Sequence, residues 1–140
     1  MRNILILGCG YVGERLGKAC VGAGMQVFGA TRSEQRASAL KQAGIEPVVT
    51  DSPADIPEDI LQGCDAVLDS IPLERSEGGM HAGQPHWLPE LARRMSHIRW
   101  AGYLSATSVY GDADGAWVDE AWPCKPASKR GIERLKAENA

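Results

Sequence analysis

Two patterns of apolar residues take turns along the chain from its first residues. Ile4 to Leu7 are all apolar, which predicts a strand over residues 3–7 that is covered on both faces. The next segment carries apolar residues at helical spacing before Gly22 and Gly24 end it. The apolar positions of this helix are Val12, Leu16, Ala19, Cys20 and Ala23. This alternation predicts βαβ units and a parallel sheet.

The alternation continues to the last residues. We expect further strands at residues 27–30, 47–50, 65–68 and 100–105. We expect helices at residues 34–43, 56–62, 85–97 and 128–139, the first of them capped by Ser33 and ended by Gly44. Residues 72–85 are polar and glycine-rich, so we expect a mobile or functional loop that is the best candidate for a lid. The pattern therefore predicts an α/β doubly wound parallel sheet of about five strands.

Composition narrows the classes of partner. The chain has 140 residues, which is the usual size of one domain, and 44% of them are hydrophobic. The net charge of −3 disfavours a general affinity for nucleic acid or for an anionic membrane surface. No apolar run approaches the roughly 18 residues of a membrane helix, and the first residues do not resemble a signal peptide. We expect a soluble, cytoplasmic protein.

The metal-ligating residue types are scattered rather than clustered. The four cysteines contain no C-x-x-C pair, so we expect packed, reduced thiols rather than a metal or redox site. They are Cys9, Cys20, Cys64 and Cys124. The three histidines lack acidic or cysteine partners at metal-ligand spacing, so we expect surface positions. They are His81, His86 and His97.

A glycine motif lies between the first predicted strand and the first predicted helix. Residues 8–13 read Gly8-Cys9-Gly10-Tyr11-Val12-Gly13, which is G-x-G-x-x-G. In such a loop Gly8 permits a tight turn, Gly10 lets the backbone approach a pyrophosphate, and Gly13 lets the helix pack close to the strand. The anion then rests on free N–H groups at the positive end of the helix dipole. The motif favours dinucleotide binding over an incidental glycine-rich turn.

The choice of dinucleotide depends on the end of the second strand. An NAD-specific site carries Asp or Glu there, whereas this chain has Thr31, Arg32 and Ser33. A guanidinium beside a hydroxyl fits a 2′-phosphate, so NADP is preferred over NAD. The alternative is a solvated Arg32 and a site that accepts both cofactors. Asp51 is placed to meet the adenine edge, or else it caps the turn before Pro53.

A second motif lies after the last predicted strand. Residues 104–111 read Leu-Ser-Ala-Thr-Ser-Val-Tyr-Gly, and residues 118–126 contain Val-Asp-Glu followed by two prolines. With the glycine motif, this pattern resembles the extended short-chain dehydrogenase/reductases, the NAD-dependent epimerase/dehydratase family. The resemblance implies a Rossmann-type sheet with a smaller C-terminal substrate domain, and a small-molecule substrate such as a nucleotide sugar. We expect residues 1–140 to be the NAD(P)-binding Rossmann domain and the front part of a longer protein.

The resemblance breaks at the catalytic positions. The family has a Ser or Thr four residues before the tyrosine of the V-Y-G segment, and this chain has Ala106 there. The positions of the family's Tyr-x-x-x-Lys motif are Arg130 and Arg134, and an arginine cannot act as the proton shuttle because it stays charged. The remaining catalytic candidates are Thr107, Ser108 and Tyr110, although this tyrosine is more typically a packing residue. Ser70, after the fourth strand, would face the cofactor or substrate.

Aromatic residues divide into two groups. We expect Trp87 and Trp100 to pack in the core or an interface, and Trp117 and Trp122 to border a substrate cleft. The charged residues 129–138 are also typical of a solvated helix face with a Lys129–Glu133 pair.

Two functions remain open. One is an NADP(H)-dependent oxidoreductase or nucleotide-sugar epimerase with a non-standard catalytic set. The other is a dinucleotide-binding sensor or partner-docking module without turnover. An S-adenosylmethionine-dependent methyltransferase is disfavoured, because it would carry an acidic residue after the second strand and no V-Y-G segment. A homodimer is an open alternative for the assembly.

Overall fold

The computed structural model describes all 140 residues, which form two compact units. We call the first the sheet unit; it contains Met1–Ile71 and Trp87–Leu104. The second, the helix–hairpin unit, contains Pro72–His86 and Ser105–Ala140. No helix is long and apolar enough to cross a membrane.

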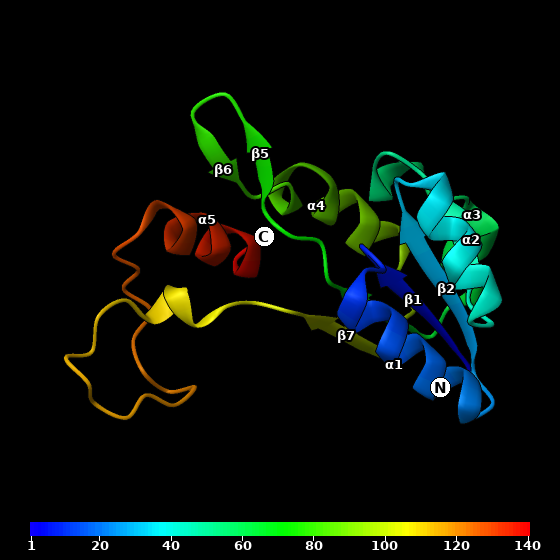
Figure 1. Cartoon of the computed structure of the whole chain (residues 1–140), viewed down its shortest axis with the longest axis horizontal. Coiled ribbons are helices and arrows are strands. Elements are labelled where there is room, and N and C mark those ends of the chain that lie inside the picture. The colour runs from blue at the N-terminus through cyan, green and yellow to red at the C-terminus, as the bar shows by residue number, and fades with distance from the viewer. The chain divides into compact units, whose positions relative to one another are not determined.

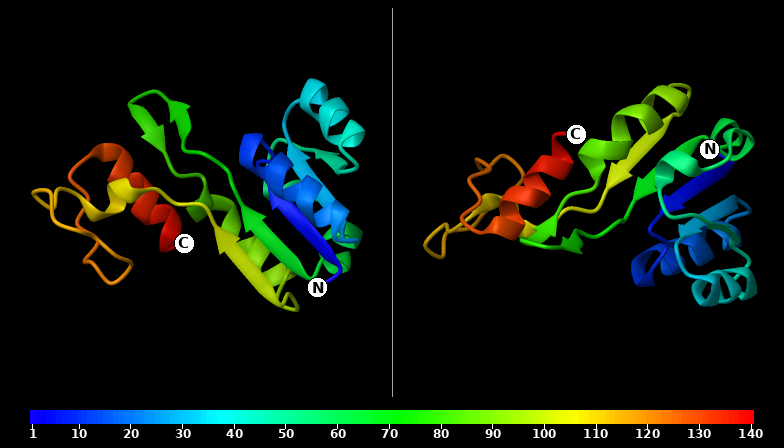
Figure 2. Two further views of the ribbon diagram at one scale, coloured as in Figure 1. Left: turned by 60° about the horizontal axis from the view of Figure 1, so that its bottom comes forward. Right: turned by 90° about the horizontal axis from the view of Figure 1, so that it is seen from above.

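The sheet unit contains five parallel strands in the order β3-β2-β1-β4-β7 (Figures 1 and 2). The strands are β1 (Asn3–Leu7), β2 (Gln26–Thr31), β3 (Glu46–Val49), β4 (Ala66–Asp69) and β7 (Trp100–Tyr103). Between them lie α1 (Tyr11–Gly22), α2 (Glu34–Gln42), the 3₁₀ turn η1 (Pro53–Asp55), α3 (Glu58–Gly63) and α4 (Gln84–Arg94), whose first turn belongs to the other unit. The predicted α/β doubly wound sheet and its five strands are confirmed.

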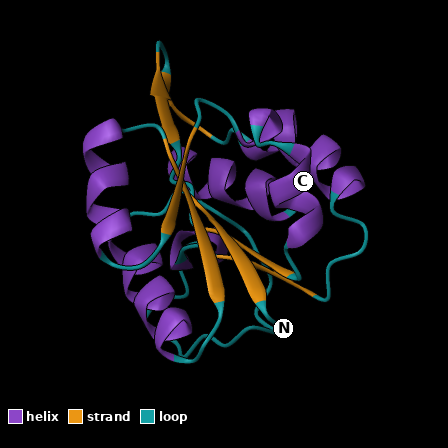
Figure 3. Ribbon diagram, turned by 90° about the vertical axis from the view of Figure 1, so that its right-hand side faces the viewer, coloured by secondary structure: helices purple, strands orange, loops and turns teal.

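Side chains of the central strands alternate between two apolar layers, and helices lie on both sides of the strands (Figure 3). Ile4 and Ile6 pack with Leu40 of α2 and with the inner side of α1. Leu5 and Leu7 pack on the opposite face, with Leu91 and other residues of α3 and α4. Because β1 is covered on both faces, every one of its apolar residues is buried.

The apolar stripe predicted for the first helix is partly wrong. Val12, Ala19 and Ala23 are exposed, and the buried positions of α1 are Gly13 and Gly17. A Cβ at Gly17 would lie 2.5 Å from Cδ1 of Ile45, so the helix approaches the sheet through its glycines. Periodicity counts side-chain hydrophobicity and therefore misses a face whose packing depends on having no side chain.

Two further predictions need correction. The helix predicted at residues 56–62 is α3, which begins at Glu58, so Pro57 precedes its first residue instead of lying in its first turn; η1 is a separate turn before it. The strand predicted to reach Ser105 ends at Tyr103, and Trp100, at 43% exposed, lies on an edge strand and not in the core. Trp87 is buried in the apolar layer with α4, as predicted.

The helix–hairpin unit contains an antiparallel hairpin, the 3₁₀ turn η2 (Thr107–Tyr110) and α5 (Lys129–Glu138). The hairpin strands are β5 (Glu74–Ser76) and β6 (Gly79–His81), joined at glycines 78 and 79 with φ of +89° and +122°. The prediction of a loop over residues 72–85 is therefore wrong where β5 and β6 pair, whereas its mobility and its role as a lid stay predictions. Three-residue strands with no apolar alternation give no periodic signal.

Candidate functional site

The three glycines of the loop between β1 and α1 have three different environments. Gly8 has φ of +66°, and a Cβ there would lie 2.9 Å from Cα of Ile71. A Cβ at Gly13 would lie 2.9 Å from Cγ2 of Ile6, so this glycine brings α1 onto β1. A Cβ at Gly10 would meet only the Gly8 carbonyl oxygen at 3.7 Å. The backbone thus turns tightly at Gly8, packs closely at Gly13 and stays open at Gly10.

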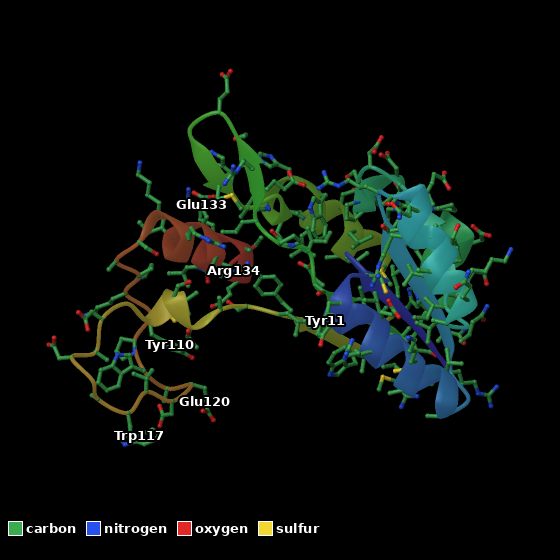
Figure 4. All side chains as sticks on the ribbon, viewed as in Figure 1. Tyr11, Tyr110, Trp117, Glu120, Glu133 and Arg134 are labelled. Carbon is green, nitrogen blue, oxygen red and sulfur yellow. The ribbon has the colours of Figure 1, made fainter.

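The first turn of α1 presents amides beside that open position. The first intrahelical bond runs from the Glu14 N–H to the Gly10 carbonyl oxygen at 2.9 Å. The amides of Tyr11, Val12 and Gly13 precede it, so they are the donors that a helix N-terminus offers to an anion. The Tyr11 ring is 70% exposed and carries the Arg15 guanidinium 3.9 Å from its centroid (Figure 4).

The residue between the first two glycines is buried. The Cys9 N–H donates to the Ala30 carbonyl oxygen at 2.9 Å, which ties the loop to β2. Burial raises the pKa of the Cys9 thiol to about 11, so the thiol is a neutral packing group. Cys64, on the other face of the sheet, is also buried and its pKa is raised to about 11 for the same reason.

A charge cluster that the sequence analysis missed holds the same loop. The Arg36 Nε donates to the Cys9 carbonyl oxygen at 3.2 Å, and its Nη2 lies 2.8 Å from Oε2 of Glu14. Lys18 lies 2.6 Å from Oε1 of Glu14. Hydrogen bonding from Lys18, with the charges of Lys18 and Arg36, lowers the pKa of Glu14. The available signal was the Glu14–Lys18 spacing of four; nothing in the sequence pairs residues 14 and 36.

The residues predicted to select the cofactor lie directly after β2. Ser33 caps α2 by accepting from the Arg36 N–H at 3.1 Å, as predicted. Thr31 Oγ1 accepts from the Ser33 N–H at 3.2 Å. Arg32 lies between them with an exposed side chain. Parallel pairing of β1 and β2 places this turn and the glycine loop at the same edge of the sheet.

The ends of β3 and β4 lie at this edge as well. Asp51 is exposed, and the alternative role predicted for it, capping the turn before Pro53, belongs to Ser52, whose Oγ accepts from the Ala54 N–H at 3.2 Å. Ser70 is half-buried and its N–H donates to the Leu7 carbonyl oxygen at 3.0 Å. Its neighbour Asp69, a buried carboxylate that accepts from the Ile71 N–H at 2.9 Å, was not predicted.

The three predicted catalytic residues belong to the helix–hairpin unit. Thr107 and Ser108 are exposed, and Tyr110 is half-buried at the end of η2 (Figure 4). The next residue, Gly111, has φ of +73°, and a Cβ there would lie 2.1 Å from the Lys125 carbonyl oxygen. The glycine of the V-Y-G segment is therefore required by the close approach of the chain around residue 125.

Helix α5 packs on η2 through a glycine of its own. A Cβ at Gly131 would lie 2.4 Å from the Ser108 carbonyl oxygen. Arg130, at the family's tyrosine position, is exposed, and Arg134, at the lysine position, is half-buried. The acidic partner in this helix is Glu133, which pairs with Lys136 at 2.5 Å instead of with Lys129 (Figure 4). Lys136, and then the Ala82 N–H that donates to Glu133 at 3.0 Å, lower the pKa of this glutamate.

The other chemistry-bearing residues show a mixed result. The three histidines are exposed, as predicted, and no group of three His, Cys, Asp or Glu side chains is arranged to hold a metal ion. Cys9 and Cys64 are packed, but Cys124 is exposed, so the prediction of packing is wrong there. Trp117 is 99% exposed on the loop after Gly111 (Figure 4). The first amides of α1 in the sheet unit are donors for an anion. Arg130, at the tyrosine position of the family that the motifs resemble, cannot take up a proton.

No protein-family model matches the chain. The protein YeeZ of Escherichia coli K12 is 31% identical over 149 aligned residues, which cover 97% of this chain and 52% of that protein. The chain therefore spans about half the length of this curated relative.

Solved structures give the same half-length correspondence. A conserved protein of unknown function from Silicibacter pomeroyi is 33% identical with a TM-score of 0.81, over 99% of this chain and 48% of that one. A short-chain dehydrogenase/reductase superfamily protein from Agrobacterium tumefaciens, solved with bound NAD, is 24% identical with a TM-score of 0.74, over 99% and 43%. The resemblance predicted from the two motifs is confirmed in the fold: this chain has the Rossmann fold of the short-chain dehydrogenase/reductases.

Proposed function

We propose that the chain binds a nicotinamide dinucleotide, with NADP(H) preferred, as part of an oxidoreductase or epimerase of the extended short-chain dehydrogenase/reductase family. The observation that carries the proposal is the glycine loop: a tight turn at Gly8, close packing at Gly13 and an open backbone at Gly10 beside the first amides of α1. This geometry suits a pyrophosphate. The NAD-bound structure of similar fold supports the same class of cofactor.

The first experiment is calorimetric titration of the chain with NADPH and NADH. Gly10→Glu should abolish measurable binding, because the carboxylate would occupy the open position and repel the pyrophosphate. The matched control is Gly22→Glu, which adds the same charge at the other end of α1, where a Cβ meets nothing within 4 Å. Equal affinity of Gly10→Glu and Gly22→Glu for the dinucleotides would show that they do not bind at the glycine loop.

The preference for NADP(H) rests on Arg32, exposed beside the edge of the sheet where the glycine loop lies. A charge-assisted hydrogen bond contributes about 1.5–3 kcal/mol, so Arg32→Ala should weaken NADPH binding roughly 10- to 150-fold. NADH binding should change little, because NADH lacks the 2′-phosphate. Equal losses for both cofactors would contradict the assignment of the 2′-phosphate to Arg32.

The proposed substrate is a small molecule such as a nucleotide sugar, and the groups proposed to act on it are Thr107, Ser108 and Tyr110.

A second candidate function, a dinucleotide-binding sensor or docking module, is favoured by Arg130 and Arg134 at the family's tyrosine and lysine positions. Arginine stays charged and offers no accepting lone pair, so it cannot shuttle the proton. The proposed homodimer is tested by sedimentation equilibrium.

Turnover separates the two candidates. The chain is incubated with NADPH and a panel of nucleotide sugars, aldehydes and ketones while the absorbance of the reduced cofactor is followed. Binding without oxidation of NADPH by any substrate of the panel would favour the sensor over the proposed enzyme. Substrate-dependent oxidation that disappears in Gly10→Glu would instead establish the enzyme and show that the hydroxyls around η2 suffice.

A further inference from the structure

Arg36 makes two contacts that join three separate segments of the sheet unit. It lies in the first turn of α2, its Nε donates to the Cys9 carbonyl oxygen at 3.2 Å, and its Nη2 lies 2.8 Å from a carboxylate oxygen of Glu14. Its side chain is only 32% exposed and that of Glu14 20%. A guanidinium presents its donors in a fixed plane, so these two contacts set the loop at Cys9 relative to α1 and α2.

The position of this contact matters because Cys9 separates two glycines. Glycine has more backbone freedom than any other residue, and the open Gly10 meets only one atom within 4 Å of an added Cβ. The backbone bonds that restrain the loop are the Cys9 N–H to the Ala30 carbonyl oxygen and the Gly10 N–H to the Gly8 carbonyl oxygen. Arg36 adds a charge-assisted bond to the Cys9 carbonyl oxygen.

Arg36 also compensates a negative charge beside the proposed anion site. Glu14 lies at the first intrahelical hydrogen bond of α1, where its carboxylate would repel a bound pyrophosphate. Lys18 and Arg36 both pair with it. The cluster of Glu14, Lys18 and Arg36 therefore carries a net charge of +1 where a glutamate alone would carry −1.

We propose that Arg36 is a positioning residue for the dinucleotide site: bound to Glu14, it holds the Cys9 carbonyl and so keeps the loop open at Gly10. The inference rests on the proposed function for its ligand, whereas the restraint on the loop is a property of the free protein. Its role differs from that of Arg32, which is proposed to touch the 2′-phosphate. Arg36 acts on the glycine loop, which is proposed to bind the pyrophosphate that both cofactors carry.

Two buried thiols report on the loop without any cofactor. Cys9 lies inside the loop and Cys64 lies on the opposite face of the sheet, and burial raises the pKa of both to about 11. The free protein is alkylated with iodoacetamide at pH 8, and the rate at each cysteine is followed by peptide mass spectrometry. The variants are Arg36→Gln and Arg36→Lys, with Arg93→Gln, from an exposed ion pair on α4, as the control for loss of charge.

We expect Arg36→Gln to speed the alkylation of Cys9 by roughly 10-fold or more, the scale of one charge-assisted bond. Loss of the Arg36 charge by itself raises the pKa of the Cys9 thiol and slows alkylation, so a faster rate reports opening of the loop. Cys64 should keep its wild-type rate, because it lies in the apolar layer on the other face of the sheet from Cys9. Arg36→Lys should not restore slow alkylation, because one ammonium lacks the fork that reaches both partners. An equal rise at Cys9 and Cys64 would show general destabilisation and overturn the proposal, as would an unchanged rate at Cys9.

The cofactor titration supplies the second measurement. Arg36→Gln should weaken NADPH and NADH by the same factor, about 10-fold, while Arg93→Gln leaves both unchanged. A loss confined to NADPH would overturn the positioning role and assign Arg36 to the 2′-phosphate itself. If the wild-type protein binds neither cofactor, the proposed function fails, and the thiol measurement still decides whether Arg36 restrains the loop.

Discussion

The two units of this chain are stabilised by different means. In the sheet unit, large apolar side chains such as Leu5, Ile6 and Leu7 are completely buried in two continuous layers. In the helix–hairpin unit, α5 meets η2 through a glycine and the hairpin through a carboxylate, and most side chains are exposed. Buried apolar area gives large stabilisation, whereas close backbone contact and single polar contacts give little.

The difference coincides with a division of proposed roles. The residues proposed to bind the cofactor lie on the rigidly packed sheet unit, and those proposed to act on the substrate lie in the unit with the smaller apolar core. Segments with few buried apolar contacts open at lower free energy than a core does. We therefore expect the helix–hairpin unit to exchange its amide hydrogens before the sheet unit.

The largest expected effect comes from removing core volume in the sheet unit. Leu5→Ala deletes a completely buried side chain in the central strand, so the free energy of unfolding should fall by about 2–5 kcal/mol. Chemical denaturation monitored by circular dichroism measures it. The control is Trp117→Ala, which removes a larger side chain that is 99% exposed and should change stability by less than about 0.5 kcal/mol. Similar losses in the two variants would contradict the contrast between the units.

A smaller loss of stability, confined to the helix–hairpin unit, is expected from a substitution in α5. Gly131→Ala places a Cβ 2.4 Å from the Ser108 carbonyl oxygen, which must shift. Overpacking costs roughly 1–3 kcal/mol and alanine gains roughly 1 kcal/mol over glycine in a helix, so we expect a net loss of up to about 2 kcal/mol. Hydrogen exchange should rise in residues 105–110 and 128–139 and stay unchanged in β1 and β4.

The matched control for that variant is Gly22→Ala. Gly22 is also a helical glycine, but nothing lies within 4 Å of its added Cβ. It should therefore slow exchange in α1 slightly, by the helix propensity alone. Faster exchange in both variants would show that the close contact at Ser108 is not what matters.

These units also differ in how far the sequence predicts them. The strands and the cap at Ser33 were predicted because each leaves a local signal: a run of apolar residues, or a serine before a helix. The glycine loop was found because its three glycines stand at fixed spacing next to such a strand. The elements that were confirmed are those whose signal lies within a few neighbouring residues of the sequence.

The features that were missed depend on contacts between distant residues. Arg36 pairs with Glu14 across 22 positions of sequence, and the glycine face of α1 depends on Ile45. The β5–β6 hairpin has no apolar alternation because it is mostly exposed. The part of the candidate site that lies in the helix–hairpin unit, from Thr107 to Tyr110, was identified from a family motif and not from a physical pattern.

One charged side chain, Arg94, also stabilises the sheet unit. Its removal should lower the free energy of unfolding about as much as the substitution of Gly131. Arg94 of α4 is 15% exposed and donates to Glu58 at 2.8 Å and to the Ala54 and Ile56 carbonyl oxygens at 2.7 Å. Arg94→Ala should cost roughly 1–3 kcal/mol, because two carbonyls and a carboxylate lose a donor. Denaturation measures the loss; Arg93→Ala, from an exposed pair, should be near neutral. Equal losses would mean that surface charge, and not these bonds, sets the effect.

The smallest expected effect is a change in pH dependence at the start of the sheet. The Asp65 Oδ2 accepts from the Arg2 N–H at 2.8 Å and the Asn3 N–H at 3.1 Å, and these bonds lower the pKa of Asp65. Because the folded pKa lies below the unfolded one, the contribution to stability is complete above the ordinary aspartate pKa of about 4 and is lost as the pH falls through the folded value. Asp65→Asn should therefore be less stable than the wild type from pH 5 to 8, and the difference should shrink as the pH falls below about 4. Denaturation curves across this range measure it. A stability difference that does not change with pH would show that the two amide bonds hold equally well to a neutral acceptor.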